Sequence, residues 1–114
     1  TGALLSCSVR LGGMSANCTT AQLRALNEFG CNIGLAFQII DDILDVTQTT
    51  KQLGKTAGKD QNVNKATYPA VVGLKKSKKI AENLTSKSFA ALKPFKGKAL
   101  ALEAMATYLL DRKY

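Results

Sequence analysis

The sequence predicts an all-α protein, and three observations support this fold class. Apolar residues recur at helical spacing along most of the 114 residues. No segment shows the alternation of apolar and polar residues that a strand requires. Thr, Gly and Pro stand where the predicted helices begin and end. With 46% hydrophobic and 21% charged residues, the composition is that of a folded chain. The length of the chain fits one domain over residues 1–114.

The first predicted helix covers residues 3–11. The adjacent glycines Gly12 and Gly13 are expected to end it, as glycines commonly do at helix C-termini. A second helix is expected to begin at Thr19, because Thr19 and Gln22 have the spacing of a capping box, in which each side chain pairs with the backbone N–H of the other.

This second helix is predicted to continue to about Thr47. Seven apolar residues recur along it at helical spacing, namely Leu23, Leu26, Phe29, Ile33, Phe37, Ile40 and Leu44. Gly30 and Gly34 lie inside it, and each costs about 1 kcal/mol relative to alanine. We therefore expect a neighbouring helix or a ligand to approach closely at these two glycines.

Residues 47–65 are polar and are expected to form a loop. A third helix is predicted to start at Pro69 and to run to Ala91, with Pro94 in the break that follows. A last helix is expected after Gly97, with one stripe formed by Leu100, Ala104 and Tyr108.

The composition excludes several kinds of chemistry. The chain has no histidine, so Ser–His–Asp and Cys–His catalysis are excluded. Its three cysteines, without CxxC spacing, argue against a zinc site and are expected to be free thiols in a reducing compartment. No apolar run reaches the roughly 18 residues of a membrane helix, and no targeting segment is visible.

Charge is unevenly distributed along the chain, which carries +8 in total. Residues 1–45 have a net charge of −2, and residues 46–114 have one of +10. An acidic cluster followed by a lysine-rich half suggests two electrostatic tasks, one of holding cations and one of holding an anion or keeping the surface soluble.

Three carboxylates form a polar stripe on the long predicted helix. Asp41 and Asp45 are one turn apart, Asp42 lies about 100° round the helix, and Gln38 stands one turn before this group. Acids on a helix are commonly a solvated face, but here the flanking residues are isoleucines and leucine. A divalent cation would offset the repulsion best, and ligands that are all oxygen favour Mg²⁺.

The segment that follows is rich in lysine and glycine. Gly54, Lys55, Gly58 and Lys59 precede Lys65, and such residues let a backbone and compact positive charges approach a phosphate group. The order of residues is not that of a Walker A loop. Carboxylates followed by lysines predict metal ions that bridge to a diphosphate.

Together these segments resemble the trans-prenyltransferases, the polyprenyl diphosphate synthases, and most of all the geranylgeranyl diphosphate synthases. The resemblance covers essentially the whole chain. It is carried by Phe37-Gln38, by Asp41-Asp42-Ile43-Leu44-Asp45, by Leu53-Gly54-Lys55-Thr56-Ala57-Gly58-Lys59-Asp60, and by Lys65-Ala66-Thr67-Tyr68-Pro69.

The resemblance implies an all-α bundle around a deep cavity, usually a homodimer, that adds isopentenyl diphosphate to an allylic diphosphate. Three acids would hold Mg²⁺ against the allylic diphosphate, and Asp41, Asp42 and Lys55 would be the catalytic residues. The implied metal ligands are Asp41, Asp42 and Asp45. The implied substrate-binding residues are Thr1, Phe37, Gln38, Lys55 and Lys65.

The chain departs from the family pattern because the first aspartate-rich motif is absent. It therefore resembles only the C-terminal portion of a family member, and we expect no prenyl transfer from these 114 residues alone. No membrane span is expected, and a soluble protein of a plastid or of the cytoplasm would fit.

Three alternative functions remain at this point. The chain could be a non-catalytic partner subunit of a prenyl synthase. Residues 74–79, with four lysines, could belong to a module that binds nucleic acid or a membrane surface. However, lysines on a helix are commonly solvated, and the run has no interleaved aromatic residues, so binding of nucleic acid is not expected. A terpene cyclase is less favoured, because its second metal motif is normally built from Asn, Ser or Thr, and Glu.

Overall fold

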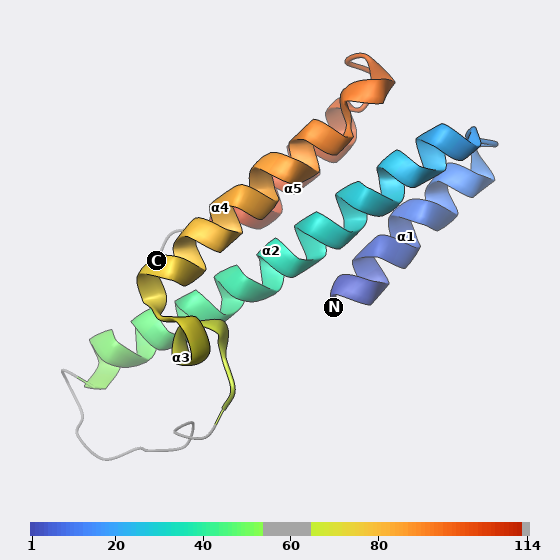
Figure 1. Ribbon diagram of the computed structural model, residues 1–114. Coiled ribbons are helices and arrows are strands. Elements are labelled where there is room, and N and C mark those ends of the chain that lie inside the picture. Colours follow the sequence, from blue (N-terminus) through green and yellow to red (C-terminus); the bar gives the residue numbers. More distant parts are fainter. Residues whose placement is uncertain (54–64, 113–114) are drawn as a thin grey trace.

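The computed structural model describes residues 1–53 and 65–112. Within these ranges every regular element is a helix, so the predicted fold class is confirmed. Figure 1 shows the long helix α2 in the middle, with α1 packed along one side and α4 and α5 along the other. The molecule is elongated, with extents of 55 × 21 × 21 Å. The elements are α1 (Gly2–Ser15), α2 (Thr20–Leu53), α3 (Tyr68–Val72), α4 (Leu74–Ala91), the 3₁₀ turn η1 (Lys93–Phe95) and α5 (Leu100–Leu110).

Helix α1 ends at Ser15, later than the glycine pair predicted. The residue that leaves the helix is Asn17, with a left-handed φ of 54°, and the N–H of Cys18 returns to the carbonyl oxygen of Gly13 at 3.0 Å. Asparagine can take this position in place of glycine. Gly13 lies within the helix, and its lack of a Cβ leaves room for Leu26, because a Cβ there would lie 2.4 Å from Cδ1 of Leu26.

The two glycines inside α2 lie where α1 crosses it closely. A Cβ on Gly30 would lie 2.7 Å from Cα of Ser6, and a Cβ on Gly34 would lie 2.6 Å from Cα of Gly2. Real Cβ atoms essentially never come this close to backbone atoms. The expected close approach is therefore confirmed, and the approaching element is a helix.

Helix α2 begins with the predicted capping box. The backbone N–H of Thr19 donates to Oε1 of Gln22 at 2.9 Å, and the N–H of Gln22 donates to Oγ1 of Thr19 at 3.2 Å. The helix continues to Leu53, beyond the predicted end near Thr47. The polar composition of residues 47–53 suggested a loop, but this stretch contains neither Gly nor Pro, so nothing in its backbone interrupts the helix.

The helix predicted from Pro69 to Ala91 is in fact two helices. Gly73 separates α3 from α4, with φ of +88° and ψ of 155°, a conformation that only glycine adopts readily. The start of α3 is capped by Thr67, whose Oγ1 accepts the N–H of Ala70 at 3.3 Å. Pro94 lies in η1, after the end of α4 as predicted.

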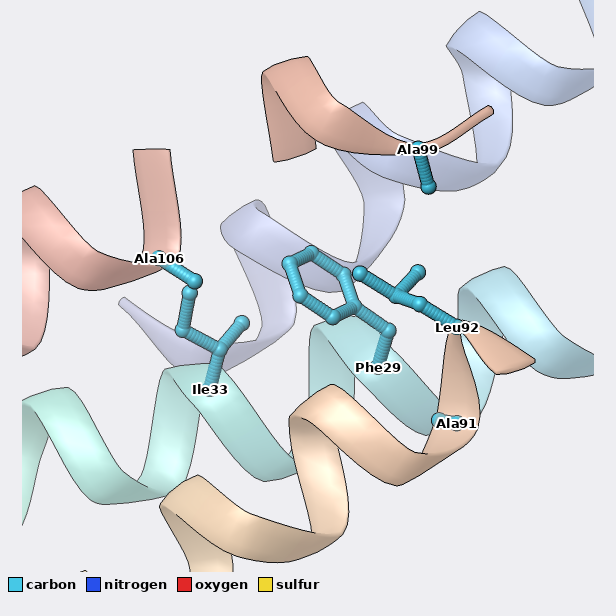
Figure 2. Packing of buried hydrophobic residues seen from close by; sticks show 6 residues of the cluster. All are labelled: Phe29, Ile33, Ala91, Leu92, Ala99 and Ala106. Atoms are coloured by element: carbon cyan, nitrogen blue, oxygen red, sulfur yellow. The ribbon is translucent and has the colours of Figure 1, made fainter. Parts of the chain in front are cut away.

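The core is formed where α4 and α5 pack on α2. Figure 2 shows Phe29 and Ile33 of α2 against residues from the end of α4 and from the α5 region. A second cluster joins Ile39, Ile40 and Ile43 to Ala81 of α4. Of the seven apolar residues predicted along α2, four are buried and three are half-buried; the buried ones are Leu26, Phe29, Ile33 and Ile40. This packing holds the acidic part of α2 in place.

Helix α5 contacts α2 through a face that the sequence did not indicate. Ala106 is fully buried, and Leu102 and Leu109 pack against the same cluster. The stripe noted in the sequence faces solvent instead, since Leu100 and Tyr108 are 68% and 82% exposed.

No helix among residues 1–53 and 65–112 combines the length and the apolar composition that a membrane crossing requires.

Candidate functional site

Five of the residues singled out in the sequence lie on the C-terminal half of α2. This part of the helix is fixed by the isoleucine cluster on its inner side. Gln38 and Asp45 are exposed. Phe37 and Asp41 are half-buried, and Asp42 is buried. The three acids therefore have three different environments, although the sequence places them within five residues.

Asp42 is held by two hydrogen bonds. Its side chain is only 6% exposed. Its Oδ1 accepts from Nε2 of Gln38 at 3.1 Å, and its Oδ2 accepts the backbone N–H of Tyr68 at 3.1 Å. Because buried carboxylates are costly without partners, these two bonds explain how an acid is tolerated here. They use one lone pair on each oxygen, and a carboxylate can accept about four bonds.

Asp41 is paired with a residue from the end of the described chain. A nitrogen of the Arg112 guanidinium donates to Oδ1 of Asp41. The same guanidinium lies over the ring of Phe37, with its central carbon 4.4 Å from the ring centroid. Arg112 thus contacts two of the predicted site residues at once, through charge and through the face of an aromatic ring.

Arg112 was not among the predicted site residues. The signal that could have indicated it is its residue type, since it is the only arginine among the basic residues of positions 46–114. Arginine is preferred over lysine where a planar cation must pair with a carboxylate and stack on an aromatic ring.

Asp45 forms an ion pair with Lys65, with 3.6 Å between Oδ2 and Nζ. Both side chains are more than half exposed, at 63% and 56%, so the pair adds little to stability. Its importance is positional, because it brings one predicted diphosphate-binding lysine to the predicted metal ligands. The other such lysine, Lys55, lies outside the described residues.

Thr1 and Gln38 line the same groove. This groove runs between α1 and α2, has a volume of about 560 Å³, and includes Leu35 and the thiols of Cys7 and Cys31. The structure therefore brings together two predicted substrate-binding residues, Thr1 and Gln38, that lie far apart in the sequence. The cysteines of the groove were expected to be free thiols, and neither forms a disulfide bond.

The side chains around the acids have the chemistry of ligands for a hard divalent cation, although they do not form a closed cluster in the described residues. The donors on this part of α2 are carboxylate and amide oxygens, the class that Mg²⁺ takes. In residues 1–53 and 65–112, no three His, Cys, Asp or Glu side chains gather closely enough to hold a metal ion. Asp41 and Asp42 instead have protein partners, so a cation that binds all three acids must compete with Arg112 and with the Tyr68 N–H.

Comparisons with known proteins agree on one family. The pattern of the polyprenyl synthetase family matches residues 1–100. The chain is 43% identical over 114 residues to "Dimethylallyltranstransferase" of Fischerella ambigua. It is 43% identical over 113 residues to "Geranylgeranyl pyrophosphate synthase 11, chloroplastic" of Arabidopsis thaliana and 44% identical over 116 residues to "Farnesyl diphosphate synthase" of Escherichia coli.

A solved structure is also similar. It is that of a protein from Marinomonas sp. MED121 provisionally named farnesyl-diphosphate synthase, with a TM-score of 0.79 and 36% identity. The match covers 97% of this chain and 36% of that one. Likewise, the match to the Fischerella protein covers all of this chain and 33% of the relative. The chain therefore spans about a third of the length of the curated relatives it matches.

Proposed function

The chain belongs to the polyprenyl synthetase family, and from that premise we propose that it forms one substrate-binding part of a prenyltransferase. The reaction is the condensation of isopentenyl diphosphate with an allylic diphosphate. The chain corresponds to the C-terminal portion of such an enzyme and supplies its second Mg²⁺–diphosphate site. The observation that carries the proposal is the group of three acids on α2 with Lys65 and Arg112 beside them.

The acids and the cations have separate roles in this proposal. Asp41 and Asp45 stand one turn apart, with exposed or half-exposed side chains, and would bind Mg²⁺ in place of their ion pairs with Arg112 and Lys65. Asp42 contributes from the lone pairs that its two hydrogen bonds leave available. When bound, Mg²⁺ would neutralise charge on the departing diphosphate.

The lysines would complete the diphosphate site. Lys65 is already within 3.6 Å of Asp45, so a diphosphate bridged to that carboxylate would lie within reach of its ammonium group. Lys55 is proposed for the same role on the resemblance of its motif. Both would stabilise negative charge on the leaving diphosphate, beside the Mg²⁺ that the acids would hold.

The groove between α1 and α2 suits the other end of an allylic substrate. Its lining includes the polar residues Thr1, Gln38 and Arg10 and the apolar residues Leu35 and Ala3. We place the diphosphate near the polar residues and the hydrocarbon chain along the apolar ones. Phe37, under the Arg112 guanidinium, would border the isopentenyl site.

The finer assignments follow the resemblance and the names of the relatives. A geranylgeranyl-type product, a homodimeric complete enzyme and a plastid location are proposed, since several relatives are named as chloroplastic geranylgeranyl pyrophosphate synthases. The farnesyl diphosphate synthase of E. coli is just as similar in sequence, so product length is to be measured on a complete protein.

A chimera tests the proposed function. The matching third of the Fischerella relative is replaced by this chain, and prenyl transfer is assayed with isopentenyl diphosphate, dimethylallyl diphosphate and Mg²⁺. We expect product from the chimera and none from the isolated 114 residues. An inactive chimera with a cooperative unfolding transition like that of the Fischerella protein would contradict the proposal.

A further inference from the structure

The turn from α3 to α4 combines exposed apolar side chains with a group of lysines. Val71, near the end of α3, is 74% exposed, and Leu74, the first residue of α4, is 37% exposed. Lys75, Lys76 and Lys79 follow in the first two turns of α4, and all three are exposed. We call these five residues the α3–α4 corner. It presents apolar side chains and positive charge at the same end of α4.

The three lysines lie on the side of α4 that faces away from α2. The inner side of the helix is marked by Ala81, which packs against the isoleucines of α2, and by Ser77, which is fully buried one turn earlier. Successive residues of a helix are rotated by about 100°, which places Lys75 and Lys79 opposite the buried residues and Lys76 beside them. The lysines therefore share one outer surface.

The stability of α4 does not account for these lysines. The N-terminus of a helix carries a partial positive charge, so acids are favourable in the first turn and lysines are not. The first turn of α4 contains no acid, and Gly73 provides no side-chain cap. Within residues 1–53 and 65–112, none of the three lysines forms an ion pair. Their positive charge is therefore open to an external partner.

A second group of lysines, near the other end of α4, has no such apolar neighbours. Lys93, Lys96 and Lys98 are exposed, but Leu92 and Phe95 beside them pack into the core. Because α4 has 18 residues, this group lies about 27 Å along the helix direction from the α3–α4 corner. The two groups carry the same charge, and only the corner adds an exposed apolar part.

An anionic lipid surface matches both features of the α3–α4 corner. Its headgroups attract lysines, and the acyl layer below them takes up the apolar side chains of proteins that lie on a membrane. A nucleic acid would match the lysines through its phosphates, but it has no apolar layer for Val71. The corner also has no aromatic residue on which a base could stack.

The α3–α4 corner lies near the candidate functional site. Figure 1 shows α3 beside the C-terminal half of α2. The first residue of α3, Tyr68, donates its backbone N–H to Asp42 at 3.1 Å. A protein that is held at a lipid surface through this corner would therefore have the acids of α2 close to that surface.

We propose that the α3–α4 corner docks the protein on an anionic lipid surface. Lys75, Lys76 and Lys79 contact the headgroups, and Val71 and Leu74 enter the layer below. The protein lies on the membrane and does not cross it. This inference goes beyond the proposed function and does not depend on it, because the charge and the exposure of the corner are the same whatever reaction the complete protein carries out.

The test is cosedimentation of the chimera with vesicles of phosphatidylcholine and phosphatidylglycerol in equal parts. The chimera is used because the isolated chain exposes apolar side chains elsewhere, such as Leu4 and Tyr108. One variant combines Lys75→Glu, Lys76→Glu and Lys79→Glu. The matched control changes the net charge by the same amount at the other end of α4, and it combines Lys93→Glu, Lys96→Glu and Lys98→Glu.

We expect the corner variant to bind the vesicles at least about tenfold more weakly than the unchanged chimera. The control should bind nearly as the unchanged chimera does, because its lysines lie farther from the corner than the Debye length of about 10 Å at 0.1 M salt. Glutamates in a first helical turn are favourable, so unfolding would not explain weaker binding by the corner variant. Equal losses from the two variants would overturn the proposal.

The apolar part of the corner has its own test. Val71→Ser should weaken vesicle binding about threefold or more, because less apolar surface then enters the lipid. Val71→Leu should retain the binding. Since this side chain is 74% exposed, neither change should disturb the fold. Vesicle binding that is the same with serine as with valine would overturn the proposal that the corner enters a lipid layer.

Salt and alternative partners complete the test. Binding should disappear at about 1 M NaCl, where the Debye length is about 3 Å, and it should be absent with vesicles of phosphatidylcholine alone. Equal binding to both kinds of vesicle would overturn the proposal. A DNA duplex that binds more tightly than the vesicles, at the same concentration of phosphate groups, would also overturn it. None of these readouts measures prenyl transfer, so an inactive chimera that binds vesicles would count against the proposed function alone.

Discussion

The carboxylate of Asp42 accepts the backbone N–H of Tyr68 at 3.1 Å, across 26 residues of sequence. The bond joins the middle of α2 to the first residue of α3, where the first-turn N–H groups have no partner within the helix. The same carboxylate accepts from Gln38. Asp42 therefore fixes both a neighbouring predicted substrate contact and the point at which the chain returns to α2.

Asp42→Ala should destabilise the chain by about 1–3 kcal/mol, because it removes a buried carboxylate that accepts two hydrogen bonds and leaves the part-buried N–H of Tyr68 without this acceptor. Urea unfolding of the 114-residue chain, followed by circular dichroism, measures this. Asp45→Ala is the matched control. Since Asp45 is an exposed carboxylate, its removal should change the free energy of unfolding by less than about 0.5 kcal/mol. Equal losses from the two variants would show that the Tyr68 bond does not stabilise the fold.

Gly34→Ala should destabilise the contact between α1 and α2. Its new Cβ would lie 2.6 Å from Cα of Gly2, and overpacking of this kind costs about 1–3 kcal/mol. Gly12→Ala is the control, because a Cβ there meets nothing within 4 Å. It should stabilise α1 by up to about 1 kcal/mol through helix propensity. Thermal unfolding of both variants checks the difference in sign, and a stabilising Gly34→Ala would refute the close packing.

Gly73→Ala should cost about 1–3 kcal/mol, since φ of +88° with ψ of 155° is strained for any residue with a Cβ. Relief of the strain favours a continuous helix through α3 and α4, which would draw Tyr68 away from Asp42. Amide hydrogen exchange at Tyr68 should therefore accelerate in this variant. Unchanged amide exchange at Tyr68 would show that the conformation of Gly73 does not control the hydrogen bond between Tyr68 and Asp42.

Arg112→Ala should strengthen Mg²⁺ binding in the chimera without diphosphate, because Arg112 and the cation compete for Asp41. Both side chains are more than a third exposed, so the loss of stability should stay below about 1 kcal/mol. Isothermal titration with MgCl₂ measures the affinity. Weaker Mg²⁺ binding in this variant would mean that Arg112 helps to build the cation site.

Local features of the fold could be predicted from the sequence, whereas the partners in contacts between distant segments could not. The capping box of Thr19 and Gln22 is defined by spacing alone, and it formed as predicted. The glycines behaved differently. Gly13 lies within a helix and leaves room for the side chain of Leu26, whereas Gly73 ends a helix through its own backbone conformation. A sequence shows the glycine in both cases but not the neighbour that decides its use.

The candidate site shows the same limit. The sequence predicted that Asp41, Asp42 and Asp45 lie on one helix, within about one turn of each other, and helix α2 confirms this. Their separate environments depend on Arg112, Tyr68 and Lys65, which lie at least 20 residues away and reach α2 only through the packing of α3, α4 and α5.

The most direct test of the account is the Mg²⁺-dependent affinity of the chimera for inorganic pyrophosphate, with and without Asp41→Asn and Asp45→Asn. We predict that the double substitution weakens binding at least about tenfold, a change of 1.4 kcal/mol, with an unchanged unfolding midpoint. Glu82→Gln, an exposed acid of α4, should leave the affinity as it was. An affinity that survives the loss of both aspartates would contradict the assignment of α2 as the Mg²⁺–diphosphate helix.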